Sequence, residues 1–287
     1  MSTNPDTFDL GAAPMRIGRV RLRVRDLDKV AEFYARVMGL RPLSTAADRV
    51  TLGTATTPLL ELTGDATLSP RDPRDAGLFH TAFLLPGRPD LGRWLAHVRD
   101  NRIPLQGASD HIVSEAVYLA DPEGNGIEVY ADRAPSGWRG ADGEIHMTTE
   151  PMDGPGVLAS AGGTAWTGFP EQGSVGHVHL QVGDTAAADR FYRDVLGFDV
   201  ASRYPGASFF GSGGYHHQLA GNVWNSRGAG ARPDGAAGLD AVEIVLNDAS
   251  LRGPILTRAA TAGVEVSTAG DAPVLRDPWG TRIALAA

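Results

Sequence analysis

The chain has 287 residues, a formal net charge of −8 and no cysteine, and this length predicts about two domains. Hydrophobic residues make up 42% and charged residues 21%, a balance that excludes a disordered protein. The acidic charge argues against a nucleic-acid or anionic-membrane partner, and there is no apolar run of about 18 residues to predict a membrane span. Without cysteine we expect no disulfide, thiolate metal ligand or cysteine nucleophile. The lack of an export signal and of cysteine favours a cytoplasmic location.

The first half of the chain gives the pattern of a strand, a helix and further strands twice. Residues 19–24 (RVRLRV) alternate as a half-buried strand does, and Asp26 then opens a helix over LDKVAEFYARVMGL, with Gly39 near its end. Short strands follow, up to PLLELTG. The pattern restarts with a buried strand, a helix and a hairpin, in the segments LFHTAFLLP, LGRWLAHVRDN and AVYLADPEGNGIEVYAD.

The second half gives the same order of elements. HVHLQV predicts a strand and AAADRFYRDVLGF a helix, and HHQLAGNVW predicts another strand. The last quarter predicts a strand, a helix and a closing hairpin, in the segments AVEIVL, LRGPILTRAATAG and APVLRDPWGTRIALAA. The chain therefore contains four similar units of strand, helix and several strands, which we number as modules one to four.

Two sequence landmarks recur and indicate a tandem duplication. FYARVMGL at 33–40 returns as FYRDVLGF at 191–198, and DPEGNGIE at 121–128 returns as DPWGTRIA at 277–284. The halves are residues 16–132 and 174–287. We expect a flexible arm over 1–15 and, over 133–173, a Gly/Pro-rich connector with little regular structure.

These motifs resemble the vicinal oxygen chelate superfamily, which includes glyoxalase I, bleomycin-resistance proteins and extradiol dioxygenases. The resemblance is carried by the FYxxVLGF motif after the first helix and the DPxGNxIE motif in the last hairpin, over nearly all of 16–287. It implies an α+β fold in which four βαβββ modules form two half-barrel domains. The segments GLFHTAFLLPGR, AVYLADPEGNGIEVYADR, VGHVHLQV and GGYHHQLAGNVW are most similar to two-domain proteins of the catechol 2,3-dioxygenase type.

The resemblance also places metal ligands. In this superfamily a His or Gln in a module's first strand and a Glu in its last strand hold the metal, and these places are His177, His80 and Glu128 here. The counterparts in modules one and four are residues that do not match the pattern: Arg19, Ala241 and Ala284. This division is explained if modules two and three share one half-barrel that keeps the site, and modules one and four share another that has lost it.

Two histidines and one carboxylate leave coordination positions open. That arrangement is typical of non-haem Fe(II) enzymes that use O2, and Mn(II) accepts the same ligands. Zinc more often takes a closed four-coordinate site. The resemblance therefore implies an extradiol dioxygenase that inserts O2 into a catechol-type aromatic diol, with the diol and O2 as its partners.

Two further residues match extradiol enzymes. Tyr118 lies ten residues before Glu128, where such enzymes carry a Tyr that hydrogen-bonds substrate oxygen; the alternative is an aromatic residue that packs in the core. The pair His216-His217 resembles the HHxxA stretch in which the second His is the acid/base, so His217 is the candidate. The alternative is a surface pair on a strand edge.

The other histidines are weaker candidates. His111 is expected over the pocket as a lid residue or else in an ordinary loop, and His179 shares a strand face with His177 and could replace it as a ligand. His97 and His146 are interpreted as structural.

Two other functions fit the same fold. One is a metal-free module that binds small aromatic or drug-like molecules. The other is a metal-dependent isomerase or lyase of the glyoxalase type, whose fourth ligand would lie near His217 or Gln218. Edge-to-edge pairing of such domains is common in the family, so the resemblance allows a homo-oligomer and leaves the oligomeric state open.

Overall fold

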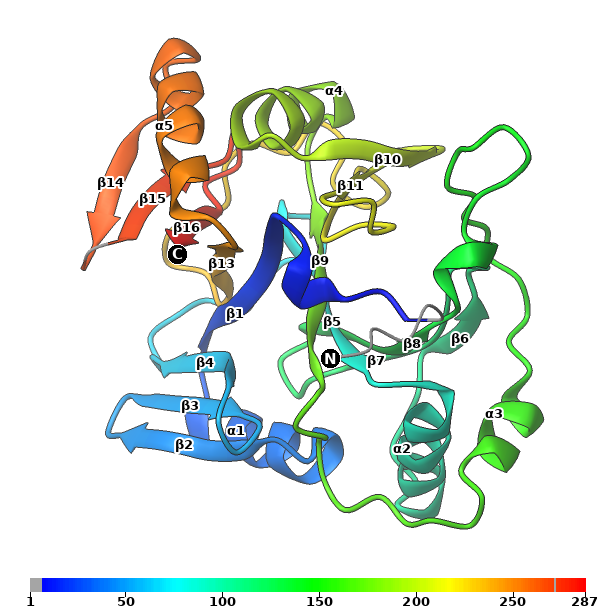
Figure 1. Ribbon diagram of the computed structural model, residues 1–287. Coiled ribbons are helices and arrows are strands. Elements are labelled where there is room, and N and C mark those ends of the chain that lie inside the picture. Colours follow the sequence, from blue (N-terminus) through cyan, green and yellow to red (C-terminus); the bar gives the residue numbers. More distant parts are fainter. Residues whose placement is uncertain (1–6, 271) are drawn as a thin grey trace.

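The computed structural model describes residues 7–270 and 272–287, and within them sixteen strands form two eight-stranded sheets with few helices (Figure 1). This confirms the α+β fold of four strand–helix–strand modules. None of the described helices is long and apolar enough to cross a membrane.

Each sheet takes one module from each half of the chain. The sheet formed by modules one and four, which we call the 1–4 sheet, has the strand order β14-β15-β16-β13-β1-β4-β3-β2. The sheet formed by modules two and three, the 2–3 sheet, has the order β10-β11-β12-β9-β5-β8-β7-β6. The first strands of the paired modules join the halves, because β1 runs antiparallel to β13 and β5 antiparallel to β9. In Figure 1 the 1–4 sheet lies on the left and the 2–3 sheet in the centre and on the right. The predicted pairing of modules is therefore confirmed.

The elements of the first half follow the predicted order. Module one consists of β1 (Met15–Val24), α1 (Leu27–Phe33), a π-helical turn (Tyr34–Met38), β2 (Arg41–Ala46), β3 (Arg49–Gly53) and β4 (Pro58–Gly64). Module two consists of β5 (Gly77–Leu85), α2 (Arg88–Asp100), β6 (Gly107–Asp110), β7 (Ser114–Ala120) and β8 (Gly126–Asp132).

The second half repeats this order after the connector. Module three consists of β9 (Ser174–Gln181), α4 (Thr185–Asp189), a π-helical turn (Arg190–Leu196), β10 (Asp199–Tyr204), β11 (Ala207–Gly211) and β12 (Leu219–Asn222). Module four consists of β13 (Gly238–Leu246), a 3-10 turn (Ala249–Leu251), α5 (Arg252–Thr261), β14 (Val266–Ala269), β15 (Ala272–Arg276) and β16 (Arg282–Ala286).

The first helix of each half begins and ends in the same way. The Asp26 side chain accepts a hydrogen bond from the backbone N–H of Lys29, and Asp184 does the same for Ala187, so each helix has an N-cap. Each helix then widens into a π-helical turn and ends at a glycine with positive φ, 73° at Gly39 and 93° at Gly197. The sequence predicted one continuous helix here, because periodicity does not distinguish a π turn from an α turn.

The two repeated landmarks contact one another in the second half. The hydroxyl of buried Tyr192, from FYRDVLGF, donates to Asp277 Oδ2, from DPWG, at 2.7 Å. Asp277 also accepts hydrogen bonds from the backbone N–H groups of Trp279 and Thr281, which shapes the turn before β16. The first landmark thus ends the helix and the second forms the turn of the last hairpin, and the Tyr192–Asp277 hydrogen bond joins the two.

The connector and the N-terminal arm are more ordered than the sequence indicated. The connector contains the helix α3 (Gly154–Ser160), and its Trp138 packs against Tyr215 with ring centroids 5.5 Å apart. Phe8 from the predicted flexible arm contacts both Trp138 and Tyr215. The arm's residues 1–6 lie outside the described residues.

Candidate metal centre

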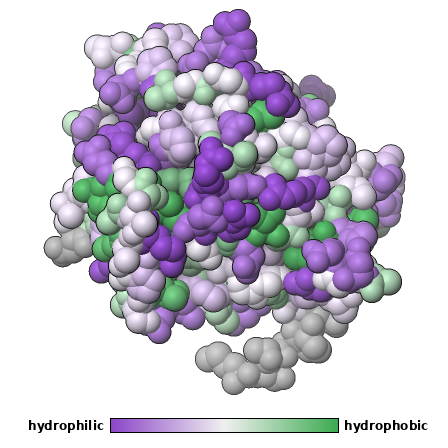
Figure 2. Space-filling model, turned by 90° about the horizontal axis from the view of Figure 1, so that it is seen from above, coloured by the Kyte–Doolittle hydropathy of each residue, from purple (hydrophilic) through white to green (hydrophobic). Residues whose placement is uncertain are grey.

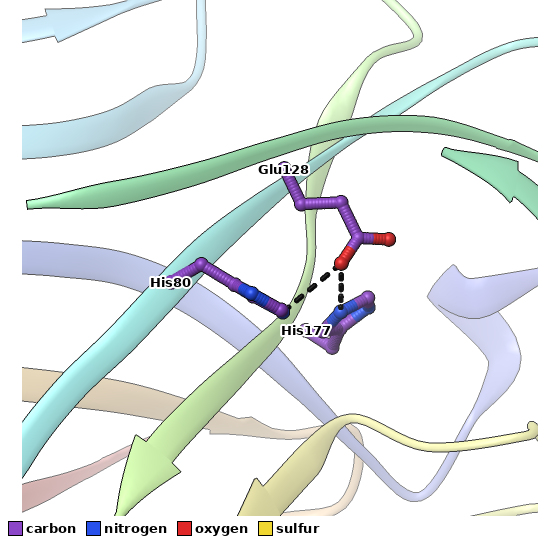
Figure 3. A group of neighbouring side chains, drawn as sticks. All are labelled: His80, Glu128 and His177. Atoms are coloured by element: carbon purple, nitrogen blue, oxygen red, sulfur yellow. Dashed lines mark ion pairs between the residues drawn. The ribbon is translucent and has the colours of Figure 1, made fainter. Parts of the chain in front are cut away.

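The register of three neighbouring strands brings the predicted ligands together. In β5, Ala82 stands opposite Glu128 of β8 on one side and opposite His177 of β9 on the other. His80 lies two residues before Ala82 and so projects from the same face. The small Ala82 side chain leaves the space above it to the three larger ones. Figure 3 shows them converging from three different strands.

The three side chains form one compact cluster. Glu128 Oε2 lies 3.0 Å from His80 Nε2 and 3.3 Å from His177 Nε2. One ligand atom from each residue lies within 4.8 Å of the others, and all three residues are buried. The buried His177 Nδ1 has no hydrogen-bond partner among the described residues.

The environment favours the protonation states that a metal requires. Burial lowers the pKa of His177 to about 4 despite the attraction of Glu128, so this imidazole is neutral at pH 7 and offers a lone pair. Burial opposes ionisation of Glu128, but the imidazoles of His177 and His80 outweigh it and lower its pKa well below the usual value. A neutral imidazole and a carboxylate are the forms in which these residues bind metals.

The cluster forms part of the wall of a cavity of about 270 Å³. Much of the remaining wall is aromatic, with Phe79, Phe209 and Trp224 among its residues. The connector covers one side through Met147, Thr148 and Thr149. The cavity is therefore a small, partly apolar space with a polar cluster on one side, which suits a small aromatic molecule.

Tyr118 and His111 lie together on the cavity wall. Tyr118 stands opposite Glu128 in the β7–β8 pairing, which places its ring on the same face as the cluster. His111 Nδ1 donates to the carbonyl oxygen of Thr148 at 2.6 Å, so the Nε2 of a neutral His111 accepts from the Tyr118 hydroxyl, also at 2.6 Å. Burial and the nearby Glu128 carboxylate raise the pKa of Tyr118 well above its usual value.

His217 also faces the cavity, with its ring centroid 4.1 Å from that of His177. Its Nδ1 lies 2.9 Å from Nδ1 of His216, whose Nε2 lies 2.9 Å from Asp132 Oδ1. Because a carboxylate only accepts, neutral His216 donates from Nε2 and accepts at Nδ1 from His217. The Nε2 of neutral His217 is then an acceptor to which no residue in the described ranges donates. The predicted strand over 216–224 was wrong at its start, since β12 begins at Leu219 and both histidines precede it.

The remaining histidines have other environments. His179 lines the cavity, but its Nε2 lies 3.0 Å from the Asn222 amide nitrogen and it does not belong to the three-residue cluster. His97 contacts the carbonyl oxygen of Arg36 and the side chain of Asn101, and His146 forms an exposed pair with Asp142.

The equivalent place in the 1–4 sheet holds ion pairs. Arg19 lies 3.0 Å from Glu61 and 3.3 Å from Glu243, and Arg21 lies within 3.8 Å of both carboxylates. Glu243 stands opposite Ala284 in the β13–β16 pairing, as Ala82 stands opposite Glu128 in the β5–β8 pairing. Arginine in its charged form binds no metal. On this face the arginine side chains instead neutralise the carboxylates of Glu61 and Glu243.

The residues of the 2–3 sheet fit a mononuclear metal ion. Two imidazoles and one carboxylate supply three nitrogen and oxygen donors, and the buried His177 Nδ1 lacks a hydrogen-bond partner in the described part of the chain. Such a set leaves positions open for other ligands.

Comparison with known proteins agrees with this architecture. The sequence profile of the Glyoxalase/Bleomycin resistance protein/Dioxygenase superfamily matches residues 16–129 and 174–285. The chain belongs to this superfamily. A protein of Bacillus subtilis (strain 168) named catechol-2,3-dioxygenase is 38% identical over 268 residues, which cover 91% of this chain and 93% of that protein. Biphenyl-2,3-diol 1,2-dioxygenase 3 of Rhodococcus globerulus is 37% identical over 65 residues, 23% of this chain and 34% of that protein.

Solved structures of the superfamily share the fold. Glyoxalase I from Zea mays superposes with a TM-score of 0.56 at 17% identity and covers 94% of this chain and 92% of its own. A provisionally named dioxygenase from Bacillus subtilis subsp. subtilis str. 168 gives 0.64 at 15% identity, over 95% of this chain and 86% of its own.

Sequence reasoning missed several residues that build the site of this superfamily member. Asp132, which orients His216, follows Glu128 by four residues, but nothing in the sequence connects it with a histidine 84 positions away. The connector residues over the cavity and Trp224 were also missed, since loops carry no periodic pattern.

Proposed function

We propose that this protein is an extradiol dioxygenase that inserts O2 into a catechol-type aromatic diol, with Fe(II) held by His80, Glu128 and His177. The observation that carries the proposal is the convergence of these three side chains on one face of the 2–3 sheet, at the wall of an aromatic-lined cavity. When bound, Fe(II) supplies a centre on which a diol and O2 are held side by side. The likeness to the Bacillus subtilis catechol-2,3-dioxygenase over 91% of the chain supports the same reaction class.

The cavity wall would orient the substrate ring. Phe79, Phe209 and Trp224 offer apolar surface to the ring, and the polar cluster receives the hydroxyl groups. The connector over the cavity limits the access of water to the reacting oxygens.

His217 is the acid/base of the proposed reaction. Its Nε2 accepts a proton from a diol hydroxyl and returns it during ring opening. The chain from Asp132 through His216 holds the proton of neutral His217 on Nδ1, which leaves Nε2 as the acceptor. Asp132 and His216 therefore act as positioning residues.

Tyr118 binds a substrate oxygen, and His111 positions it. The phenol keeps its proton at neutral pH, because the pKa of Tyr118 is raised by burial and by Glu128. It donates that proton to His111 Nε2, so its hydroxyl oxygen is the acceptor for a diol hydroxyl. His111 fixes the Tyr118 hydroxyl through the 2.6 Å contact.

Anaerobic reconstitution tests the proposal. We expect the chain to bind one Fe(II) and, on addition of catechol and oxygen, to consume O2 and form a yellow ring-fission product. His80→Ala should abolish iron binding, whereas His97→Ala, a control on α2 away from the cavity, should bind iron normally. Mn(II) in parallel identifies the preferred metal.

Two results would contradict the proposal. Iron-loaded protein that turns over no diol from a panel of substituted catechols is not an extradiol dioxygenase of this class. Protein that binds aromatic diols tightly but takes up neither metal supports the metal-free binding module instead.

A further inference from the structure

A second cavity, of about 440 Å³, lies at one end of the central strands of the 1–4 sheet. None of the candidate metal ligands lines it. It opens where β1 and β4 end and where β3 and β16 begin, and the segment around Pro233 borders it. Its wall contains two aspartates, Asp234 and Asp240, and five arginines: Arg23, Arg49, Arg232, Arg276 and Arg282.

The neighbouring carboxylates neutralise only part of the positive charge of these five arginines. Arg282 forms an ion pair with Asp240, and Arg23 lies 3.8 Å from Asp65. Arg49 reaches Glu61 only at 3.9 Å, and that carboxylate also serves Arg19 at 3.0 Å.

Two of the five guanidinium groups bind only backbone oxygens among the described residues. Arg232 donates to the carbonyl oxygens of Ala237 and Leu239, and Arg276 to that of Gly280 at 3.4 Å. A guanidinium has five N–H donors, so both keep donors for another acceptor.

The five arginines around this cavity repel one another, which raises the free energy of the folded protein. A bound anion would reduce that repulsion. Like charges repel more strongly at a partly desolvated site than in water. Burial lowers the pKa of Arg232, and the neighbouring Arg23 and Arg71 lower it further, against the opposing effect of Asp240. A chain with a net charge of −8 nevertheless concentrates arginines from four strands and one loop around a single hollow.

We propose that this cavity is a binding site for a phosphate group, carried by a small ligand. Arginine is suited to phosphate because its planar fork donates two parallel hydrogen bonds. The arginines approach from β1, β3, β15, β16 and the loop before β13, and a tetrahedral oxyanion can accept from several such directions at once. The site lies on the sheet that has lost the metal ligands, so the two sheets would bind different molecules.

Calorimetric titration of the metal-loaded 287-residue chain with inorganic phosphate at low ionic strength tests the site. We expect saturable binding of one phosphate per chain, with sodium chloride of equal ionic strength giving no such heat. The double variant Arg49→Gln, Arg276→Gln should bind at least tenfold more weakly. Arg99→Gln, at an exposed position at the end of α2, should bind as the unchanged protein does.

The results distinguish this phosphate site from the proposed ring-cleaving activity. Phosphate that fails to saturate, or that binds the double variant with unchanged affinity, overturns the proposal. Both substituted side chains are largely exposed, so the variants should fold; if the double variant does not, Arg276→Gln alone must weaken binding at least threefold. Because ring-cleaving activity is measured separately, loss of phosphate binding with normal turnover refutes only this second site.

Discussion

The two sheets share one backbone plan and carry opposite chemistry on the equivalent face. In the 2–3 sheet, Ala82 of the first strand stands opposite a carboxylate, Glu128, in the last strand. In the 1–4 sheet the places are exchanged, since Glu243 of the first strand stands opposite Ala284. The same exchange of a small and an acidic residue, together with Arg19 in place of His177, separates a cluster that could hold a metal ion from an ion-pair network. The backbone thus supplies positions, and a few side chains decide which molecule is bound.

The largest expected effect comes from removing the carboxylate of Glu128 in the 2–3 sheet, and the matched change at Glu243 in the 1–4 sheet is its control. Glu128→Gln keeps the volume but takes away the anionic ligand, so we expect iron content near zero and a fall in kcat/KM of at least about a thousandfold. Glu243→Gln should change neither quantity, because that carboxylate pairs only with arginines. Metal analysis and steady-state O2 uptake measure both.

If Glu128→Gln retains iron and activity, or if Glu243→Gln loses them, the metal has been placed on the wrong sheet. His80 and His177 would then be a buried structural pair.

A smaller effect is expected from the hydrogen-bond chain behind His217. In Asp132→Asn the amide nitrogen can face His216 Nε2, which would move the His216 proton to Nδ1 and the His217 proton to Nε2. The acceptor facing the cavity would be lost. We expect kcat to fall about a hundredfold with KM and iron content unchanged, a split that a loss of folding would not produce.

The chain offers a matched control for this variant. Asp142 pairs with His146 at 3.1 Å, but both side chains are exposed and lie in the connector. Asp142→Asn should leave kcat as it is. An equal loss in the two variants would mean that Asp132 acts through general stability, and a change of melting temperature would reveal it.

The smallest expected effect concerns stability of the 1–4 sheet. Glu61 contacts Arg19, Arg21 and Arg49, and its side chain is 13% exposed. Glu61→Gln should lower the free energy of unfolding by about 1–2 kcal/mol, because three cations lose a shared partner. Iron binding should be unaffected. Urea unfolding monitored by tryptophan fluorescence gives the value, and unchanged stability would show that solvent already screens these pairs.

The sequence predicted the module order, the pairing of modules and the residues that cluster, because duplication makes departures from the pattern visible. Each ligand position could be compared with its copy, and Arg19, Ala241 and Ala284 stood out. The sequence also predicted the alternating burial along β1, since Val20, Leu22 and Val24 are fully buried while the arginines between them are partly exposed.

The parts that could not be predicted depend on contacts distant in the chain. The hydrogen bond between Asp132 and His216 and the covering of the cavity by Met147 have no local pattern. The helix α3 in the Gly/Pro-rich connector was missed because it depends on an Asp153 cap and a proline in its first turn more than on periodicity.

The joining of β1 to β13 constrains how this protein is made. β13 begins more than two hundred residues after β1 ends, so β1 is synthesised long before its antiparallel neighbour is available. Until then β1 exposes an unpaired edge, the kind of surface on which newly made chains aggregate. Each sheet takes one module from each half of the chain. A chain cut in the connector would therefore give two fragments, and neither could form a complete sheet without the other.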